Sequence, residues 1–326
     1  MIPVFLIPLF YSKAFADYAT ILVYHRFGDD RYPSTSVSLE DFEAQMKFLR
    51  EQGFKVIPLS SLINSLRKRE KIQPKTVVIT IDDGYKSTMK AFEILKKFNY
   101  PFTVFLYMEA VDRYPDFLSL EDIKKLKNYG KVEFENHSYS HRAFGLMRDT
   151  ETFLKDLEKS EERFEKIFGH KPNFYALPFG YYNSEILAIL KEKGYKAVFT
   201  QDPGNVNNFT DLYRIPRQAI VGSWSKMENF KKKLFREALT LQRLIPTYGF
   251  LEENPPEKIG AVLKYPNLYK DCRIYITELG WEIAKRKGNF VFRDNIPFLK
   301  RKWNRVGVKC RNLNGKWAES FWIIAR

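Results

Sequence analysis

Short apolar runs alternate with amphipathic helical patterns from Thr20 to Val221. The clearest run is Thr76–Ile81, which is rich in β-branched residues and leads into Asp82-Asp83-Gly84. A helical pattern follows, with Ala91, Phe92, Leu95 and Phe98 at helix spacing. Strands that alternate with helices in this way predict parallel βαβ units, and therefore a barrel or a doubly wound sheet of the α/β class.

The pattern changes in the last third of the chain. A helix is predicted from Lys226 to about Leu244, and prolines then interrupt the chain. Asn314-Gly315 between two strand patterns is a strong hairpin signal. The expected strands here are 272–277, 281–285, 289–292, 304–310 and 317–324. We therefore predict a small antiparallel β domain, sandwich-like, after the α/β part.

The first residues resemble a secretory signal peptide. Ile2–Tyr11 is apolar, and Ala14-Phe15-Ala16 has the Ala-x-Ala form of a cleavage site, although no basic residues precede the apolar run. A buried first strand or helix is the alternative. The expected organisation is a signal peptide over 1–16, an α/β domain over 17–225, a helical linker over 226–247 and a β-rich accessory domain over 248–326. We expect an exported protein of the periplasm, the extracellular space or the cell envelope, with no transmembrane segment.

The chain is basic, with 54 Lys and Arg against 39 Asp and Glu and a net charge of +15. This balance favours acidic partners, but no nucleic-acid module is present, so we expect no nucleic-acid binding. We interpret the charge mostly as solvated surface, with peripheral association with the envelope left open. Cys272 and Cys310 could pair in an exported chain, or could be two buried free thiols.

Carboxylates and imidazoles follow two of the predicted strands. Asp82 and Asp83 end one strand, and His137-Ser-Tyr-Ser-His141 follows another, at Lys131–Glu135. Because the carboxyl ends of parallel strands meet on one rim, these side chains should lie together. Imidazole and carboxylate form three-ligand open sites for catalytic zinc. Each motif alone also fits an ordinary turn, helix cap or surface pair.

Three motifs together resemble the polysaccharide deacetylase (NodB-homology) family of carbohydrate esterases. Thr80-Ile81-Asp82-Asp83-Gly84 resembles its Thr-Phe-Asp-Asp-Gly motif, His137-Ser-Tyr-Ser-His141 its metal motif, and Pro178-Phe179-Gly180 its third motif. The resemblance covers about Tyr18 to Val221. It is strongest to the exported branch that includes poly-N-acetylglucosamine deacetylases, which also carries a segment like Tyr24-His25.

The resemblance implies a fold, a cofactor and a set of roles. The fold would be an irregular (β/α) barrel of about seven strands. Asp83, His137 and His141 would hold a divalent metal ion, zinc in the first place, with cobalt or nickel as alternatives. Asp82 would be the general base, and the backbone N–H of Phe179 would stabilise the oxyanion. The reaction would remove N-acetyl groups from an N-acetylglucosamine polymer such as an exopolysaccharide, peptidoglycan or a chitin-like chain.

Two departures from the family weaken this assignment. Many members place an arginine, which orients the base, at the position that Ala176 occupies here. Arg214 or Arg217 could orient the base instead. The alternative is that Arg217 merely forms a salt bridge at the start of a strand. Many members also carry a late Leu-x-His motif whose histidine protonates the leaving amine, yet no histidine follows His170. His170 lies in a predicted surface turn, which leaves His25 as the spare imidazole, either in the site or purely structural.

These departures motivate one alternative function, that of a weakly active or non-catalytic polysaccharide-binding protein with a degenerate site. A metal hydrolase for another amide or ester is a further alternative. Tyr181 or Tyr182 could stack on sugar rings. In the β domain, Trp281, Trp303, Trp317 and Trp322 suggest either carbohydrate binding or a packed core, and the alternation around Trp322 favours the core.

Overall fold

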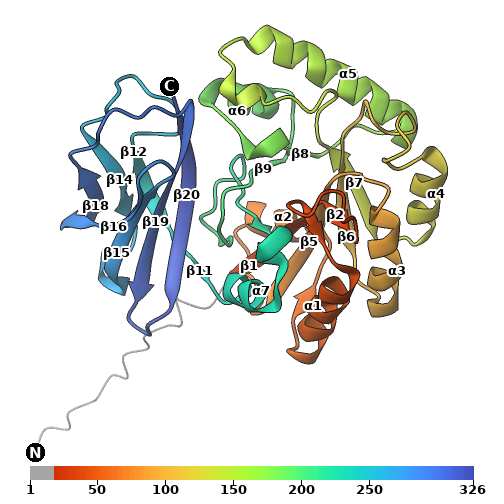
Figure 1. The fold of residues 1–326 in the computed structure, drawn as a ribbon, viewed down its shortest axis with the longest axis horizontal. Coiled ribbons are helices and arrows are strands. Elements are labelled where there is room, and N and C mark those ends of the chain that lie inside the picture. The colour runs from red at the N-terminus through yellow and green to blue at the C-terminus, as the bar shows by residue number, and fades with distance from the viewer. Residues whose placement is uncertain (1–17) are drawn as a thin grey trace, which may run out of the picture.

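The computed structural model describes residues 18–326, and the proposed signal peptide lies outside them. An α/β domain and a β domain stand side by side (Figure 1). The strands of the first domain are β1 Ala19–Tyr24, β2 Arg26–Phe27, β3 Ser36–Val37, β4 Lys55–Val56, β5 Thr76–Asp83, β6 Phe102–Leu106, β7 Val132–Asn136, β8 Phe174–Ala176, β9 Ala197–Phe199 and β10 Gln218–Ala219. Its helices are α1 Leu39–Glu51, α2 Leu59–Arg67, α3 Thr88–Phe98, α4 Leu120–Asn128, α5 Thr150–Phe168, α6 Ser184–Glu192 and α7 Met227–Leu234.

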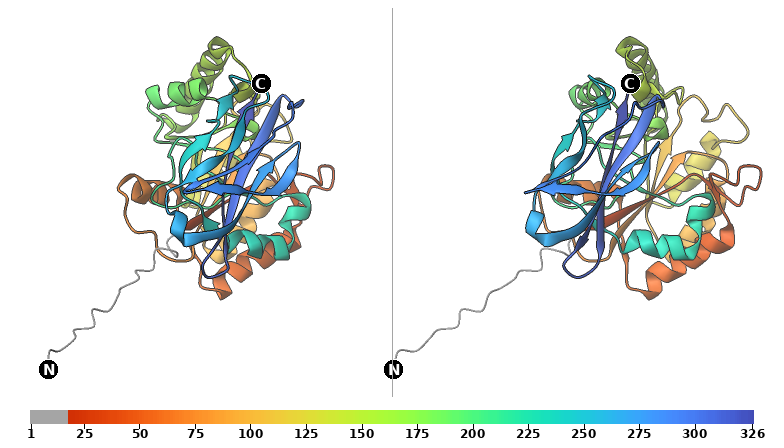
Figure 2. Two further views of the ribbon diagram at one scale, coloured as in Figure 1. Left: turned by 90° about the vertical axis from the view of Figure 1, so that its left-hand side faces the viewer. Right: turned by 60° about the vertical axis from the view of Figure 1, so that its left-hand side comes forward.

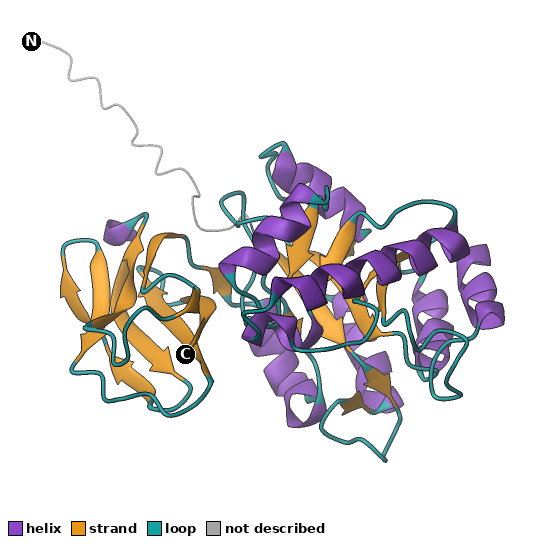
Figure 3. Ribbon diagram, turned by 90° about the horizontal axis from the view of Figure 1, so that it is seen from above, coloured by secondary structure: helices purple, strands orange, loops and turns teal. Residues whose placement is uncertain are grey.

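The first domain is the predicted irregular barrel. Its parallel sheet runs in the order β10-β1-β5-β6-β7-β8-β9, with β4 beside β5. The segment that leads into β10 returns to β9, where Ile215 forms a parallel bridge with Phe199. Strand β5 is buried along its whole length because it pairs with neighbours on both sides and helices cover its outer face. Seen from above, the helices surround the strands of this domain (Figure 3).

Local sequence signals set several of the element ends. The side chain of Ser38 accepts a hydrogen bond from the Asp41 N–H at the start of α1, as the capping pattern predicts. Gly169 takes a left-handed conformation at the end of α5, where a residue without Cβ is favoured. The strands of the sheet are parallel, so the loops that follow them open on the same rim of the barrel.

The second domain is a sandwich of two sheets, β11-β20-β19-β15-β16 and β12-β14-β18-β17, with β13 added beside β20. Its core is formed by side chains from both sheets, including Ile259, Ala261, Val308 and Trp322. Cys272 and Cys310 form a disulfide across β15 and β19. The strands are β11 Glu237–Ala238, β12 Leu241–Ile245, β13 Gly249–Phe250, β14 Lys258–Leu263, β15 Tyr269–Ile276, β16 Gly280–Ile283, β17 Lys285–Lys287, β18 Phe290–Asp294, β19 Trp303–Asn312 and β20 Trp317–Ala325.

The prediction of a helix over 226–244, and with it a wholly helical linker over 226–247, is wrong. Helix α7 ends at Leu234, and the chain enters β11 and then β12. Sheet pairing outweighs the local helical pattern here: β11 pairs with β20, and β12 pairs with β14. The β domain therefore begins earlier than the sequence indicates.

Buried polar contacts hold the two domains together. Asp202 of the barrel accepts hydrogen bonds from the Tyr182 hydroxyl at 2.7 Å and from Arg305 Nε of β19 at 3.0 Å. Arg236 Nη1 donates to both carboxylate oxygens of Glu319 in β20, at 2.8 and 2.7 Å. When the molecule is turned so that the sandwich faces the viewer, it stands in front of the barrel (Figure 2). Strands β19 and β20 are thus fixed against the barrel.

Candidate active site

Three of the predicted residues converge on the barrel rim. Asp83 ends β5, His137 follows β7, and His141 lies four residues further on. Asp83 Oδ1 lies 3.2 Å from His137 Nε2 and 3.0 Å from His141 Nε2. Burial opposes ionisation of Asp83, but the two imidazoles outweigh it and hold the pKa of this carboxyl well below its ordinary value. The structure therefore brings together the predicted ligand set.

The donor atoms of this cluster fit a metal ion. His137 Nδ1 lies 2.7 Å from the Ala176 carbonyl oxygen, to which it can only donate, so its Nε2 is left with a lone pair. Nε2 of His137 and Oδ1 of Asp83 are buried, and neither has a regular hydrogen-bond partner among the described residues. Ligand atoms of the three side chains lie within 4.8 Å of one another. Two imidazole nitrogens and one carboxylate oxygen form a donor set typical of an open zinc site.

The loop between the two histidines is held by a carboxylate that the sequence analysis missed. Asp156 of α5 accepts hydrogen bonds from the N–H groups of Tyr139 and Ser140, each at 2.9 Å. The Ser138 side chain accepts from the His141 N–H at 2.9 Å. The sequence did carry a signal for Asp156, because this acid falls on the apolar stripe of the α5 pattern beside Phe153 and Leu157. A buried acid needs hydrogen-bond partners.

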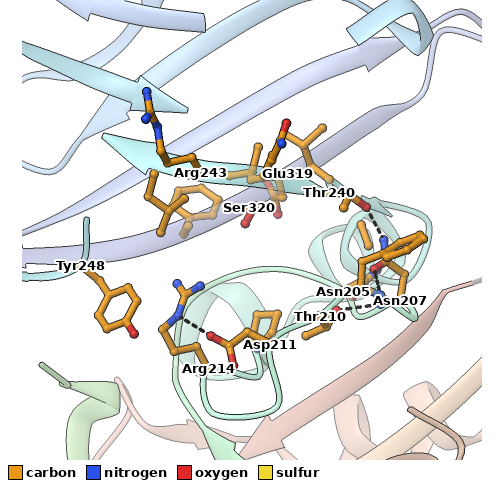
Figure 4. Close-up of a pocket in the computed structure, with 18 of the residues that line it drawn as sticks. Asn205, Asn207, Thr210, Asp211, Arg214, Thr240, Arg243, Tyr248, Glu319 and Ser320 are labelled. Atoms are coloured by element: carbon orange, nitrogen blue, oxygen red, sulfur yellow. Dashed lines mark hydrogen bonds and ion pairs between the residues drawn. The ribbon is translucent and has the colours of Figure 1, made fainter. Parts of the chain in front are cut away.

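Asp82 faces the barrel interior and pairs with Arg217. Arg217 Nη1 and Nη2 donate to the two carboxylate oxygens, each at 2.7 Å, and both side chains are fully buried. Burial opposes ionisation of Asp82, but the guanidinium outweighs it and lowers the pKa of this carboxyl. Arg214, the other candidate, points into a hollow between the domains, where it pairs with Asp211 (Figure 4).

His25 and Phe179 lie at the same rim. His25 follows β1, and its Nε2 is 3.4 Å from the Gln201 amide nitrogen. Desolvation lowers the pKa of His25 below its ordinary value, against the opposing effect of Asp83. Phe179 has a left-handed backbone, with φ 59°, and its ring packs edge-on against His141 at 4.7 Å between centroids. The turn around it is closed by the Gly180 N–H, which donates to the Leu177 carbonyl at 2.8 Å.

A cleft of about 670 Å³ opens over the cluster. His25, Asp83 and His141 lie in its floor, and residues of both domains line its walls. The hollow of Figure 4, about 460 Å³ in volume, lies elsewhere along the domain interface and is lined by none of the candidate metal ligands. His170 is exposed near the amino ends of β7 and β8, outside the site as predicted.

Of the two tyrosines considered for sugar stacking, only Tyr181 lines the cleft. Tyr182 is fully buried and bonded to Asp202. Among residues 18–326, no helix is both long enough and apolar enough to cross a bilayer.

Residues 69–198 match the polysaccharide deacetylase family, and they include Asp82, Asp83, His137, His141 and the Pro178-Phe179-Gly180 turn. The chain carries a polysaccharide deacetylase domain. The deacetylase domain is similar to that of curated and solved relatives. A poly-beta-1,6-N-acetyl-D-glucosamine N-deacetylase of Staphylococcus aureus is 29% identical over 217 residues, which cover 63% of this chain and 74% of the relative.

Two solved structures are similar in fold and sequence to the deacetylase. IcaB from Ammonifex degensii aligns with a TM-score of 0.60 at 25% identity, covering 67% of this chain and 97% of that one. A polysaccharide deacetylase from Bacillus cereus aligns with a TM-score of 0.59 at 25% identity, covering 67% and 69%. The chain is therefore an enzyme of the deacetylase class, as the motifs predicted.

Proposed function

We propose that this deacetylase is metal-dependent, and that it removes N-acetyl groups from an N-acetylglucosamine-containing polysaccharide outside the cytoplasm. The observation that supports metal dependence best is the convergence of Asp83, His137 and His141, whose donor atoms lie within 4.8 Å of one another at the cleft. The relative from Staphylococcus aureus, named for a β-1,6-linked N-acetylglucosamine polymer, supports the substrate class.

Asp83, His137 and His141 would hold the divalent ion, of which zinc suits the donor set best and cobalt or nickel are alternatives. When bound, such an ion polarises a carbonyl and increases the acidity of bound water. Asp82 would accept the proton of the attacking water, and its pairing with Arg217 keeps it ionised for that purpose.

Other groups on the rim have distinct proposed roles. The N–H of Phe179, held in a fixed turn, would donate to the oxyanion. Among the described residues that line the cleft, His25 is the one histidine that is not a candidate metal ligand, so it would deliver a proton to the departing amine. Acetate would leave, and the sugar would keep a free amine.

Export is supported by the disulfide between Cys272 and Cys310, since such bonds persist in oxidising compartments. The apolar segment and Ala14-Phe15-Ala16 support it as well. The net charge of +15 would suit peripheral contact with an anionic envelope.

The test combines metal content with acetate release. The purified protein is stripped, reloaded with zinc, cobalt or nickel, and assayed on N-acetylglucosamine oligomers. We expect one bound ion per chain, lost in Asp83→Ala and His137→Ala together with acetate release. His170→Ala is the matched control, because this exposed histidine lies outside the site. Asp82→Asn should keep the ion and lose turnover.

Each component of the proposal has its own contradicting outcome. Failure of the wild-type protein to bind any of the three ions would refute the metal site. An ion that binds without release of acetate from any N-acetyl sugar would instead favour a polysaccharide-binding protein or another amide or ester as substrate.

A further inference from the structure

The outer face of the larger β sheet forms a wall of the catalytic cleft. Alternate residues of β19 and β20 point to opposite faces, so that Val306, Val308 and Trp322 enter the sandwich core. The intervening residues, which include Trp303 and Phe321, point the other way and line the cleft. One side of these strands therefore stabilises the β domain, while the other faces the site.

A row of aromatic side chains crosses this outer face. The strand register places Trp281 opposite Tyr275, Tyr275 opposite Gly307, and Gly307 opposite Phe321. The ring of Phe321 lies over Gly307, where a Cβ atom would be 2.2 Å from Phe321 Cε1. Because Gly307 has no side chain, Phe321 reaches across β19 to contact Trp281, with 5.9 Å between ring centroids. The row depends on this glycine.

Ring contacts connect the candidate metal site with this wall. His141 contacts Phe179 at 4.7 Å, Phe179 stacks on Tyr181 at 6.0 Å, and Tyr181 contacts Trp303 of β19 at 5.0 Å. The same cleft is lined by Trp281 and Phe321. The surface is thus continuous from the metal ligands to the edge strand β16.

The chemistry of the wall fits a sugar chain. Flat aromatic rings bind the apolar C–H faces of pyranoses, and polar groups beside them bind hydroxyls. Trp281 is 38% exposed, so its ring is accessible from the cleft. Lys309 Nζ lies over the Trp281 ring, 4.0 Å from its centroid, and Arg305, whose Nε donates to Asp202, lines the same cleft. The Lys309 ammonium and the Arg305 guanidinium are charged donors among these rings, of the kind that can bind hydroxyl and acetamide oxygens.

We propose that Trp281, Trp303 and Phe321, here called the aromatic wall, bind the sugar units that flank the unit being deacetylated. The proposal rests on the proposed function, since the occupant is the polymer that carries the acetamide. The β domain thereby makes the enzyme selective for chains over single sugars. The interdomain pairs Arg305–Asp202 and Arg236–Glu319 hold the wall at a fixed place relative to the metal ligands.

The experiment measures chain-length preference. kcat/KM for acetate release is determined on dimers and pentamers of N-acetylglucosamine, with both β-1,4 and β-1,6 linkages, for the wild type, Trp281→Ala and Phe321→Ala. We expect the pentamer-to-dimer ratio to fall about tenfold in each variant. Trp281→Phe should restore most of it. Phe298→Ala is the matched control: it removes an exposed aromatic of the same domain that does not line the cleft, and should keep the wild-type ratio.

Binding without turnover separates this inference from the proposed function. Pentamer affinity is measured by calorimetry in an Asp82→Asn background, with and without Trp281→Ala. A tenfold weaker affinity supports the wall even if no sugar is deacetylated, in which case the proposed function fails alone. Wild-type length preference together with wild-type affinity in Trp281→Ala and Phe321→Ala would overturn the inference while deacetylation stands.

Discussion

The buried pair of Asp82 and Arg217 allows the sharpest prediction. Both side chains are inaccessible to solvent, and two hydrogen bonds of 2.7 Å join them. Arg217 Nε also donates to the Thr200 carbonyl at 2.9 Å. The substitution Arg217→Met keeps much of the side-chain volume and removes the charge, so Asp82 is left as an unpaired buried carboxylate.

We expect a large loss in the free energy of unfolding, because the buried carboxylate of Asp82 loses the guanidinium that offsets its desolvation. Breaking a buried ion pair on one side costs about 3–5 kcal/mol of the free energy of unfolding. The pKa of Asp82 in the folded wild type is lowered, so the pair contributes stability above the unfolded pKa, which is lost as pH falls through the folded one. In the variant burial dominates, the folded pKa of Asp82 rises, and ionisation at higher pH opposes folding.

The assay is urea unfolding followed by circular dichroism at neutral pH and near pH 4, about the ordinary pKa of an aspartate. We expect the deficit of Arg217→Met to be about 3–5 kcal/mol at neutral pH and clearly smaller near pH 4. Adding Asp82→Asn should recover part of it at neutral pH, because no charge then remains. Arg113→Met is the control: its side chain is 54% exposed and pairs with Glu109, so we expect a loss of about 0.5 kcal/mol or less.

Two outcomes would refute this reasoning. A deficit as small as that of Arg113→Met would show that Asp82 is not held as a buried ion. A deficit of equal size at both pH values would show that the loss comes from packing around Arg217 and is unrelated to the charge of Asp82.

Three further predictions concern stability. Burial raises the pKa of Glu135 to about 8, whereas the unfolded chain releases this proton near pH 4.5, so the free energy of unfolding should decline from about pH 4.5 to pH 8. In a pH series of urea unfolding curves, Glu135→Gln should remove this decline. The Cys272–Cys310 bond closes a separation of 38 residues, so Cys272→Ser with Cys310→Ser should lower the free energy of unfolding by about 4 kcal/mol; no loss in calorimetry would contradict this. Gly180→Ala should lower the free energy of unfolding by about 1–3 kcal/mol and shift the Phe179 turn, because the φ of Gly180 is +73° and a Cβ would lie 2.4 Å from the Gln201 nitrogen. An unchanged melting temperature would contradict this prediction.

The position of the candidate metal ligands could be predicted from the sequence because each follows a strand of one βαβ series. The carboxyl ends of parallel strands share a rim, so Asp83 and His137 were expected on the same rim once the alternation was recognised, and β6 lies between their strands. The partner of Asp82 could not be chosen in this way. Arg217 is 135 residues away, and only the pairing of β10 with β1 decides that it, and not Arg214, enters the barrel.

The tryptophans of the β domain show the same limit. Alternation along β20 correctly placed Trp322 in the core, where it is fully buried. It could not indicate that Trp281 and Trp303 face the barrel, because that depends on how the two domains dock. The predicted helix after Lys226 was too long for a similar reason, because the pairing of β11 with β20 cannot be seen in a local helical pattern.

The backbone around the site explains how neighbouring residues take different directions. In a regular strand Asp82 and Asp83 would point to opposite faces, and Asp83 would be directed toward the helices. Asp83 instead has a φ of 70°, which turns its carboxylate toward His137 and His141. His141 and Phe179 are also left-handed, with φ of 52° and 59°. Such conformations cost about 1–2 kcal/mol each for residues with a Cβ. Glycine would remove that cost, but at Asp83 and His141 it would also remove a candidate ligand atom, so the positive φ of these two residues supports the metal site proposed above.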